Sequence, residues 1–156
     1  VQPIGLQLLQ LALHRRETEV AWRTAKLLAE KSPRRLGNRN NYAYLSLLLN
    51  RGVEEASASI EEAVKLAPLN SAFLGTMALA RLREGRVDEA FAVMERLGEQ
   101  GLTPGEQATK VAILLAMGHQ ADAIAVARVL RPHMMLPEEW SLLGEATPKN
   151  SPSSPQ

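Results

Sequence analysis

Three short segments of this sequence follow one another at an almost constant interval: Gly52–Ala56 (GVEEA), Gly85–Ala90 (GRVDEA) and Gly118–Ala123 (GHQADA). Their closing alanines lie 34 and 33 residues apart, and a fainter copy, Glu17–Ala21 (ETEVA), ends 35 residues before the first of them. A repeat of this length is typical of proteins that stack similar structural units. The sequence therefore predicts four related units.

Each unit is predicted to be a pair of α-helices that meet near the glycine. Apolar residues recur at helical spacing before it, as in Tyr42, Leu45 and Leu49, and after it, as in Ile60 and Val64. Glycine suits a tight turn between helices because it adopts a left-handed backbone conformation at little cost. The predicted helices are 4–14, 18–31, 38–50, 53–66, 71–84, 87–100, 104–117, 120–131 and 137–145.

Prolines and one capping sequence mark the predicted helix ends. Pro33 and Pro68 lie 35 residues apart and stop the second helix of their units, because proline cannot continue a helix interior. Thr103–Glu106 (TPGE) combines a Thr N-cap, a Pro at the first helical position and a Glu that completes a capping box. These signals fix the start of the predicted helix 104–117.

The composition supports an all-helical domain. The 156 residues, 46% of them hydrophobic, fit one domain, and 25 Leu and 22 Ala exceed 9 Val and 4 Ile, which favours helices over strands. The absence of Cys excludes disulfides, thiolate metal sites and cysteine nucleophiles. No apolar run reaches the roughly 18 residues of a membrane span. Because the sequence starts with Val1 rather than Met, we expect it to be a piece of a longer protein. The residues do not determine the cellular compartment, and a cytoplasmic location is slightly favoured.

These features resemble the tetratricopeptide repeat family. The residues that carry the resemblance in copy 37–70 are Ala43, Tyr44, Leu47, Ala56, Ile60, Ala63 and Pro68. The resemblance implies an all-α, right-handed superhelical solenoid of antiparallel helix pairs over 1–146, with repeats at about 2–36, 37–70, 71–103 and 104–136. A capping helix at 137–146 would cover the last pair with Trp140 and Leu143; the alternative, that this segment starts another repeat, is less favoured because a Pro- and Ser-rich tail follows. The Pro- and Ser-rich tail 147–156 is expected to be disordered.

The resemblance also implies a concave groove, lined by the first helix of each pair, that binds peptides or partner proteins. The positions that would line it here are Asn38, Asn41, Tyr42, Leu45, Leu49, Thr76, Leu79, Arg83, Ala112 and Leu115. Ala72, Gly75 and Thr76 stand where the family's carboxylate-binding site has Lys and Arg, so no carboxylate clamp is expected. We expect the groove to bind an apolar or helical segment of the same chain, a second copy or a partner. Alternatively, its leucines pack against neighbouring helices.

The net charge of +1 hides an uneven distribution. Residues 1–52 have nine basic and three acidic side chains, whereas residues 53–156 have nine basic and fourteen acidic ones. Arg34, Arg35 and Arg39 would form a basic rim that attracts an acidic partner or the acidic end of another copy. The alternative is a solvated turn whose charges contribute little.

Other function classes receive less support from the residues. A self-association domain of a larger protein is the second hypothesis. The segment from Ala90 to Pro104 also resembles one pentatricopeptide unit, which would imply RNA binding, but the neighbouring copies and the balanced charge argue against it. His14, His119 and His133 lie in different units, and no phosphate-binding loop or nucleophile motif occurs. We therefore expect no enzyme activity, no cofactor and no metal site.

Overall fold

The structure, a computed structural model, describes residues 3–149, which are all-helical and contain no strand. The elements are α1 (Ile4–His14), α2 (Thr18–Lys31), α3 (Leu36–Leu48), α4 (Val53–Leu66), α5 (Ser71–Arg83), α6 (Val87–Leu97), α7 (Pro104–Ala116), α8 (Gln120–Ala127), the 3₁₀ turn η1 (Pro132–Met134), α9 (Pro137–Ser141) and the 3₁₀ turn η2 (Gly144–Ala146). The all-α expectation is confirmed. Most of the predicted tail, residues 150–156, lies outside the described residues.

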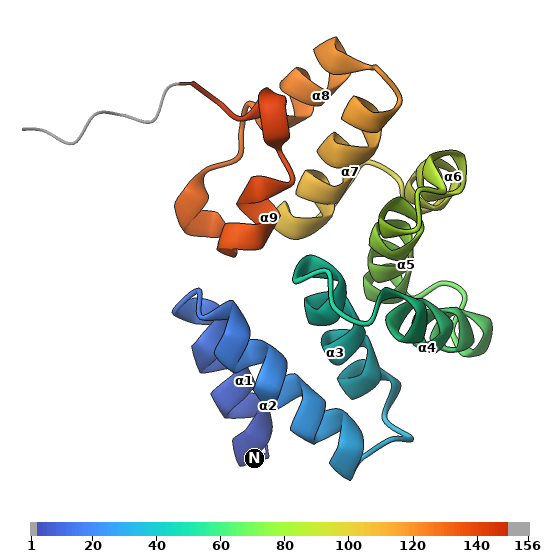
Figure 1. Cartoon of the computed structure of the whole chain (residues 1–156), viewed down its shortest axis with the longest axis vertical. Coiled ribbons are helices and arrows are strands. Elements are labelled where there is room, and N and C mark those ends of the chain that lie inside the picture. The colour runs from blue at the N-terminus through green and yellow to red at the C-terminus, as the bar shows by residue number, and fades with distance from the viewer. Residues whose placement is uncertain (1–2, 150–156) are drawn as a thin grey trace, which may run out of the picture.

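Successive helices pack against one another along the chain. Contacts join α1 to α2, α3 to α4, α5 to α6 and α7 to α8, and further contacts join each pair to the next. Figure 1 shows the helices along an arc, from α1 and α2 at the lower left through α3, α4 and α5 to α7 and α8 at the top. The segment that contains α9 then returns on the inner side of this arc, toward α3 and the first pair.

The turns inside the four helix pairs are built alike. Each contains a left-handed residue, which is Gly85 or Gly118 in the last two pairs and Arg16 or Asn50 in the first two. In every turn the next backbone N–H donates to a carbonyl five residues before it, as from Glu17 to Ala12. This bond pattern is the Schellman motif that ends many helices. The same backbone hydrogen bond and a left-handed residue recur in all four turns, at intervals close to those of the repeated alanines. The backbone conformation of the turns therefore supports the predicted repeat.

Three helices, α6, α8 and α9, end three or four residues earlier than the sequence predicted. Helix α6 stops at Leu97 because Gly98 has a φ of 82° and a ψ of −170°, which no helix can contain. Helix α8 stops at Ala127, and Arg131 is extended, as a residue before proline prefers to be. The expected helix 137–145 breaks after Ser141, and Gly144 takes a left-handed conformation.

Small and branched side chains fill two adjoining cores. The larger one runs from α1 to α6 and the smaller one lies between α7, α8 and the C-terminal segment. All four repeated alanines are buried: Ala21, Ala90 and Ala123 completely, and Ala56 with 5% of its surface exposed. The neighbours Met135 and Leu136 belong to different cores, so the C-terminal segment joins the two.

In the part of the chain from residue 3 to residue 149, none of the helices is both long and apolar enough to cross a bilayer.

Candidate functional site

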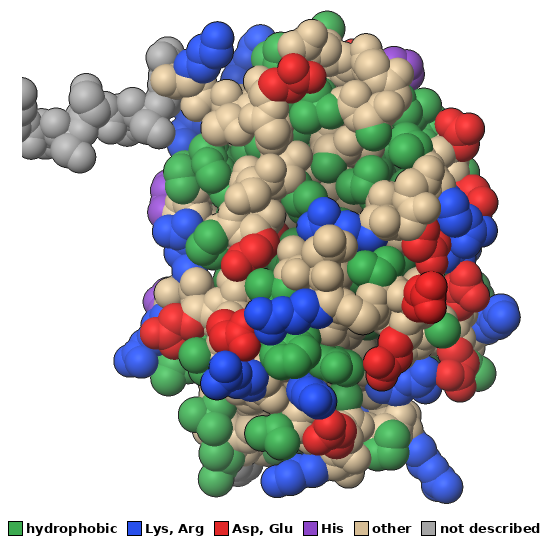
Figure 2. Space-filling model, in the orientation of Figure 1, with side chains coloured by type: hydrophobic (Ala, Val, Ile, Leu, Met, Phe, Trp, Pro, Cys, Tyr) green, Lys and Arg blue, Asp and Glu red, His purple; other side chains and the backbone are tan. Residues whose placement is uncertain are grey.

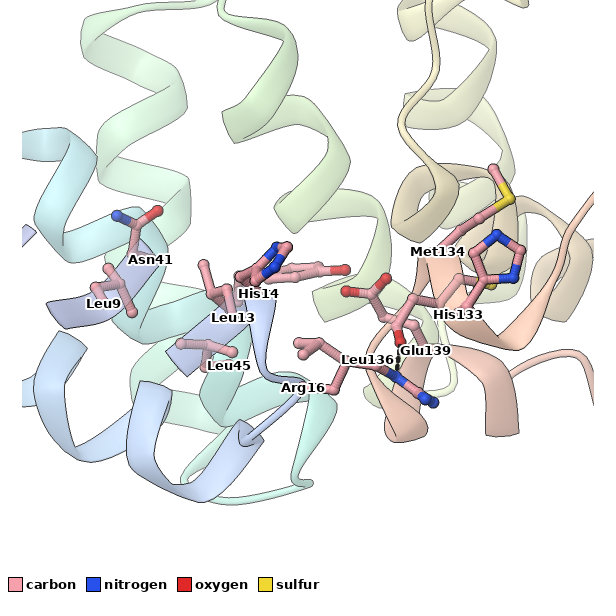
Figure 3. Close-up of a pocket in the computed structure, with 12 residues that line it drawn as sticks. Leu9, Leu13, His14, Arg16, Asn41, Leu45, His133, Met134, Leu136 and Glu139 are labelled. Atoms are coloured by element: carbon pink, nitrogen blue, oxygen red, sulfur yellow. Dashed lines mark hydrogen bonds between the residues drawn. The ribbon is translucent and has the colours of Figure 1, made fainter. Parts of the chain in front are cut away.

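The inner side of the arc holds residues 133–139 of the chain itself. They lie between the α1–α2 turn and α3 on one side and the start of α7 on the other. Figure 3 shows Leu9, Leu13 and Leu45 facing Leu136 and Glu139 across a shared space. Leu136 is buried against the larger core, whereas Met134 is exposed. The inner side of the arc therefore contains a binding seat that a short segment of the chain, residues 133–139, already occupies.

Polar contacts fix this segment to the first helix pair. Arg16 donates from Nε to the backbone oxygen of Met135 at 2.7 Å, the bond dashed in Figure 3. The hydroxyl of Thr18 donates to a carboxylate oxygen of Glu138 at 2.5 Å. Both donors lie at the turn between α1 and α2, so this one turn recognises a backbone carbonyl and an acidic side chain of the segment.

Tyr44 and Glu139 form the polar centre of the seat. Tyr44, on α3, lies beside Glu139, because its hydroxyl and a Glu139 carboxylate oxygen are the two atoms nearest to a Cβ placed at Gly105. Burial raises the pKa of Glu139, and the nearby donors of Tyr44 and of the Leu136 backbone oppose that rise. Burial, with the nearby charges of Glu139 and Glu106, raises the pKa of Tyr44 well above its ordinary value. The phenol therefore stays protonated and available as a donor.

A cavity of about 440 Å³ remains between the segment and α1 and α3. Its walls include aliphatic side chains, two histidines, Arg16, Asn41 and Glu139, so it offers both apolar surface and hydrogen-bonding groups. A second hollow of about 340 Å³ lies toward α5 and the start of α7. Asn40 borders it, and its side-chain oxygen is buried without a partner among the described residues. The segment thus leaves room for ligand atoms on both sides.

Three predicted groove residues border these two hollows. Asn41 and Leu45 line the first, and Thr76 lines the second. Leu45 is only 2% exposed and belongs to the larger core. The Leu45 side chain therefore packs in the core behind the cavity wall and offers almost no apolar surface to a ligand.

The other predicted groove residues have local structural contacts. Leu79 is completely buried in the larger core, so it cannot face an open groove. Asn38 donates to the backbone oxygen of Leu28, and Arg83 donates to those of Leu47 and Leu48, which cap the ends of α2 and α3. The remaining four, all half-buried and none of them lining either hollow, are Tyr42, Leu49, Ala112 and Leu115.

Tyr42 and Leu115 have identifiable neighbours of their own. The Tyr42 ring packs on Trp22 of α2 with ring centroids 5.9 Å apart. Leu115 packs against the smaller core, close to Gly144 of the C-terminal segment. Both side chains therefore stabilise contacts between elements that are neighbours in the fold.

The basic rim is divided in the structure. Arg39 is bound within the molecule, because it pairs with Glu62 at 2.6 Å and also donates to Ser59. Arg34 and Arg35 are exposed in the connection between α2 and α3. Only these two arginines of the three are therefore free to meet another molecule's acidic groups.

Arg16, Thr18, Tyr44 and Glu139 were not among the sequence candidates. The sequence assigned 137–146 to the last helix pair, and nothing local showed that its first residues also reach the first pair. One sequence feature could have drawn attention to this segment: Pro137 followed by two glutamates, which is typical of a helix start with acidic side chains at its N-terminus. Residues 3–149 hold no group of three or more acidic or His side chains placed to bind a metal ion.

Comparison of the chain with protein-family models, with curated proteins and with solved structures finds no match. The relation to tetratricopeptide repeats therefore stays a resemblance of sequence pattern.

Proposed function

We propose that this chain is a non-enzymatic protein-interaction module, a right-handed superhelical solenoid of the tetratricopeptide type whose inner groove binds a segment of a partner protein. The observation that supports this most is the seat itself, where an apolar turn and the start of a helix lie against first helices from several pairs. A groove that holds one such segment from its own chain has the shape and the hydrogen-bonding groups to hold another.

The bound segment indicates which partner chemistry fits. It presents a buried apolar pair, Met135 and Leu136, followed by Pro137 and two glutamates at the start of a helix. Arg16 and Thr18 contact its backbone and its first carboxylate. We propose that a partner competes for the seat with the same features, an apolar pair just before an acidic helix N-terminus.

Peptide competition tests the proposal. Leu136→Asp should release the segment, because a carboxylate is costly to place among Leu9 and Leu45. A fluorescent peptide with the sequence Met134–Leu143 should then bind this variant with micromolar affinity by anisotropy and bind the unaltered chain much more weakly. Leu69→Asp, at a site 92% exposed, is the matched control and should behave like the unaltered chain.

Two outcomes would contradict the groove proposal. One is a Leu136→Asp variant that keeps its helical circular dichroism yet binds no peptide. The other is equal binding of a peptide that itself has Asp at the position of Leu136. Single-stranded RNA at low salt serves as a separate probe, and the pentatricopeptide alternative requires a mobility shift that we do not expect.

A further inference from the structure

The hollow between the C-terminal segment and α5 has an acidic wall. Glu106, in the first turn of α7, and Glu139, on α9, border it together with Asn40 of α3 and Thr76 of α5. Among the residues that the structure describes, no Lys, Arg or His lines this space of about 340 Å³. We call it the acidic hollow. Because α3, α5, α7 and α9 all contribute to its wall, the acidic hollow is complete only while the segment occupies its seat.

The two carboxylates have no cation beside them to balance their charge. Within residues 3–149 no basic side chain forms an ion pair with Glu106 or Glu139, and Lys110, one turn after Glu106, pairs with Glu99 instead. Other acidic side chains are balanced: Arg81 alone pairs with three glutamates. Figure 2 shows acidic and basic side chains intermixed at the right, where Figure 1 places α4, α5 and α6. Because Glu139 is only 9% exposed, water compensates its charge poorly, and the acidic hollow favours a positively charged ligand.

Two glycines allow the carboxylates to lie against the walls of the acidic hollow. Oε1 of Glu106 is 3.1 Å from the place that a Cβ would take at Gly75 of α5. Oε2 of Glu139 is 2.9 Å from the corresponding place at Gly105 of α7. A side chain at either glycine would push a carboxylate away from its position. The backbones of α5 and α7 are therefore bare at the two points where the acidic side chains approach them.

The other polar side chains of α3 and α5 at the acidic hollow supply acceptors. Asn40 is only 8% exposed, and its side-chain oxygen has no hydrogen-bond partner among the described residues. Thr76 donates its hydroxyl hydrogen to the backbone oxygen of Ala72 at 3.1 Å, so its oxygen can only accept. Glu106 uses Oε2 to accept from the backbone N–H of Thr103 at 3.0 Å, which leaves Oε1. A buried acceptor without a donor is costly, so a ligand that brings several donors matches this wall.

We propose that the acidic hollow binds a primary ammonium group on a short alkyl stem. An ammonium has three N–H donors and no acceptor, and its compact charge suits separate acceptors on different helices, whereas a planar guanidinium suits one carboxylate. Ala72, Pro104 and Met134 also line the hollow and offer apolar surface to the methylene groups of the stem. A free amine and the lysine side chain of a partner protein share this chemistry. Either ligand contacts both the segment, at Glu139, and the helices around it, so it holds the segment in its seat.

Calorimetric titration of the unaltered chain tests the ligand chemistry. Pentylamine should bind saturably, one molecule to one chain, with a dissociation constant of about 1 mM or lower. Its N,N,N-trimethyl analogue has the same charge and no N–H donor, and should bind at least about 10-fold more weakly. The peptide acetyl-Gly-Lys-Gly-amide is the second probe. Tighter binding of the peptide identifies the ligand as a lysine side chain, and tighter binding of pentylamine identifies it as a free amine; both results support the ammonium site.

Charge-removing variants test the site. Glu106→Gln with Glu139→Gln keeps the shape of both side chains, and Gln can replace Glu in the capping box at Thr103. This double variant should weaken pentylamine binding by about 100-fold or more, and each single variant by about 10-fold. Glu54→Gln with Glu95→Gln changes the net charge equally at exposed sites on α4 and α6, and should leave the affinity unchanged. Circular dichroism checks that all the variants fold.

Nuclear magnetic resonance locates the bound amine independently of the variants. The backbone amide signals of Gly75 and Gly105 and the side-chain amide signals of Asn40 should shift as pentylamine is added. Three results overturn the proposal: no saturable binding of any probe, equal binding of the trimethyl analogue, or equal weakening in the double variant and its control. None of these measurements uses the Leu136→Asp variant or its peptide. The groove proposal can therefore fail while the ammonium site stands, and the reverse also holds.

Discussion

The outer faces of the first and last helix pairs differ in how far they are covered. At the C-terminal end, α8 lies under Leu143 and Ala146, and its inward alanines are inaccessible to water. At the N-terminal end, α1 and α2 leave Leu8 and Leu27 about half exposed. The same helix-pair unit therefore carries its own cover at one end and an aliphatic face at the other. The chain's own C-terminal segment thus closes one end, whereas none of the residues from 3 to 149 covers the aliphatic face at the other.

The largest expected effect comes from removing the cover. Leu143→Ala deletes a completely buried side chain and should lower the free energy of unfolding by about 2–5 kcal/mol. Leu8→Ala, at a site on α1 that is 52% exposed, should change the free energy of unfolding by less than about 0.5 kcal/mol. Urea denaturation of both variants measures the contrast. Equal losses would show that the two ends are not energetically distinct.

The next effect concerns how the C-terminal segment sits on the inner side. A Cβ at Gly105 would overlap the Tyr44 hydroxyl and a carboxylate oxygen of Glu139. Gly105→Ala should therefore destabilise the chain by about 1–3 kcal/mol. Gly37 has the same place in α3, the second residue of the helix, with nothing within 4 Å of the added carbon. Gly37→Ala should stabilise by roughly 0.5–1 kcal/mol, so opposite shifts in thermal midpoint are expected.

Changes at helix caps should have smaller effects on stability, of opposite sign at the two ends: removing a cap from α7 should destabilise the chain, and adding one to α1 should stabilise it. Helix α7, in the covered pair, begins with a complete capping box between Thr103 and Glu106. Helix α1 has Pro3 at its N-cap position, without a side-chain cap, and no acidic residue in its first turn. Thr103→Ala should cost about 1 kcal/mol, and Pro3→Asp should add up to about 1 kcal/mol, measured by urea denaturation. A loss on adding the cap would mean that Pro3 already stabilises the uncovered end by other means.

The smallest effect is a dependence on pH through Glu139. Its pKa is raised in the folded chain because it is buried, so the folded chain binds this proton more tightly than the unfolded one. The stability from this group is complete below the ordinary Glu pKa and is lost as the pH rises through the raised value. Glu139→Gln should flatten this decline in urea midpoints between acidic and neutral pH. Parallel curves for the two proteins would contradict the assignment.

Much of the helical framework could be predicted from the sequence. Gly85, Gly118 and the capping box at Thr103 act through their immediate neighbours, and they mark turns and starts that the structure contains. The contact of Leu143 with α7 and α8 was also expected, because an apolar helix after a last repeat has that face to cover. Local chemistry and the period of the repeat were sufficient for these features.

The seat on the inner side could not be predicted in the same way. A helix such as α3 has neighbours on several sides, α2, α4 and α5, so its apolar residues recur around most of its circumference. Helical spacing alone cannot tell Leu45, which supports the core, from a side chain that lines a groove. The contacts of Arg16 and Glu139 depend on the curvature of the whole array, which no window of sequence encodes.

The turn at Arg16 has a consequence for how the chain opens. Most contacts in the molecule join helices that are close in sequence, and an array of that kind can fray one pair at a time from either end. The bonds from Arg16 to Met135 and from Thr18 to Glu138 span 119 and 120 residues. Such long-range contacts raise the contact order, and the entropy of closing the loop is lost when they form. We expect the two extremities to release together, in one concerted step, rather than to unravel separately.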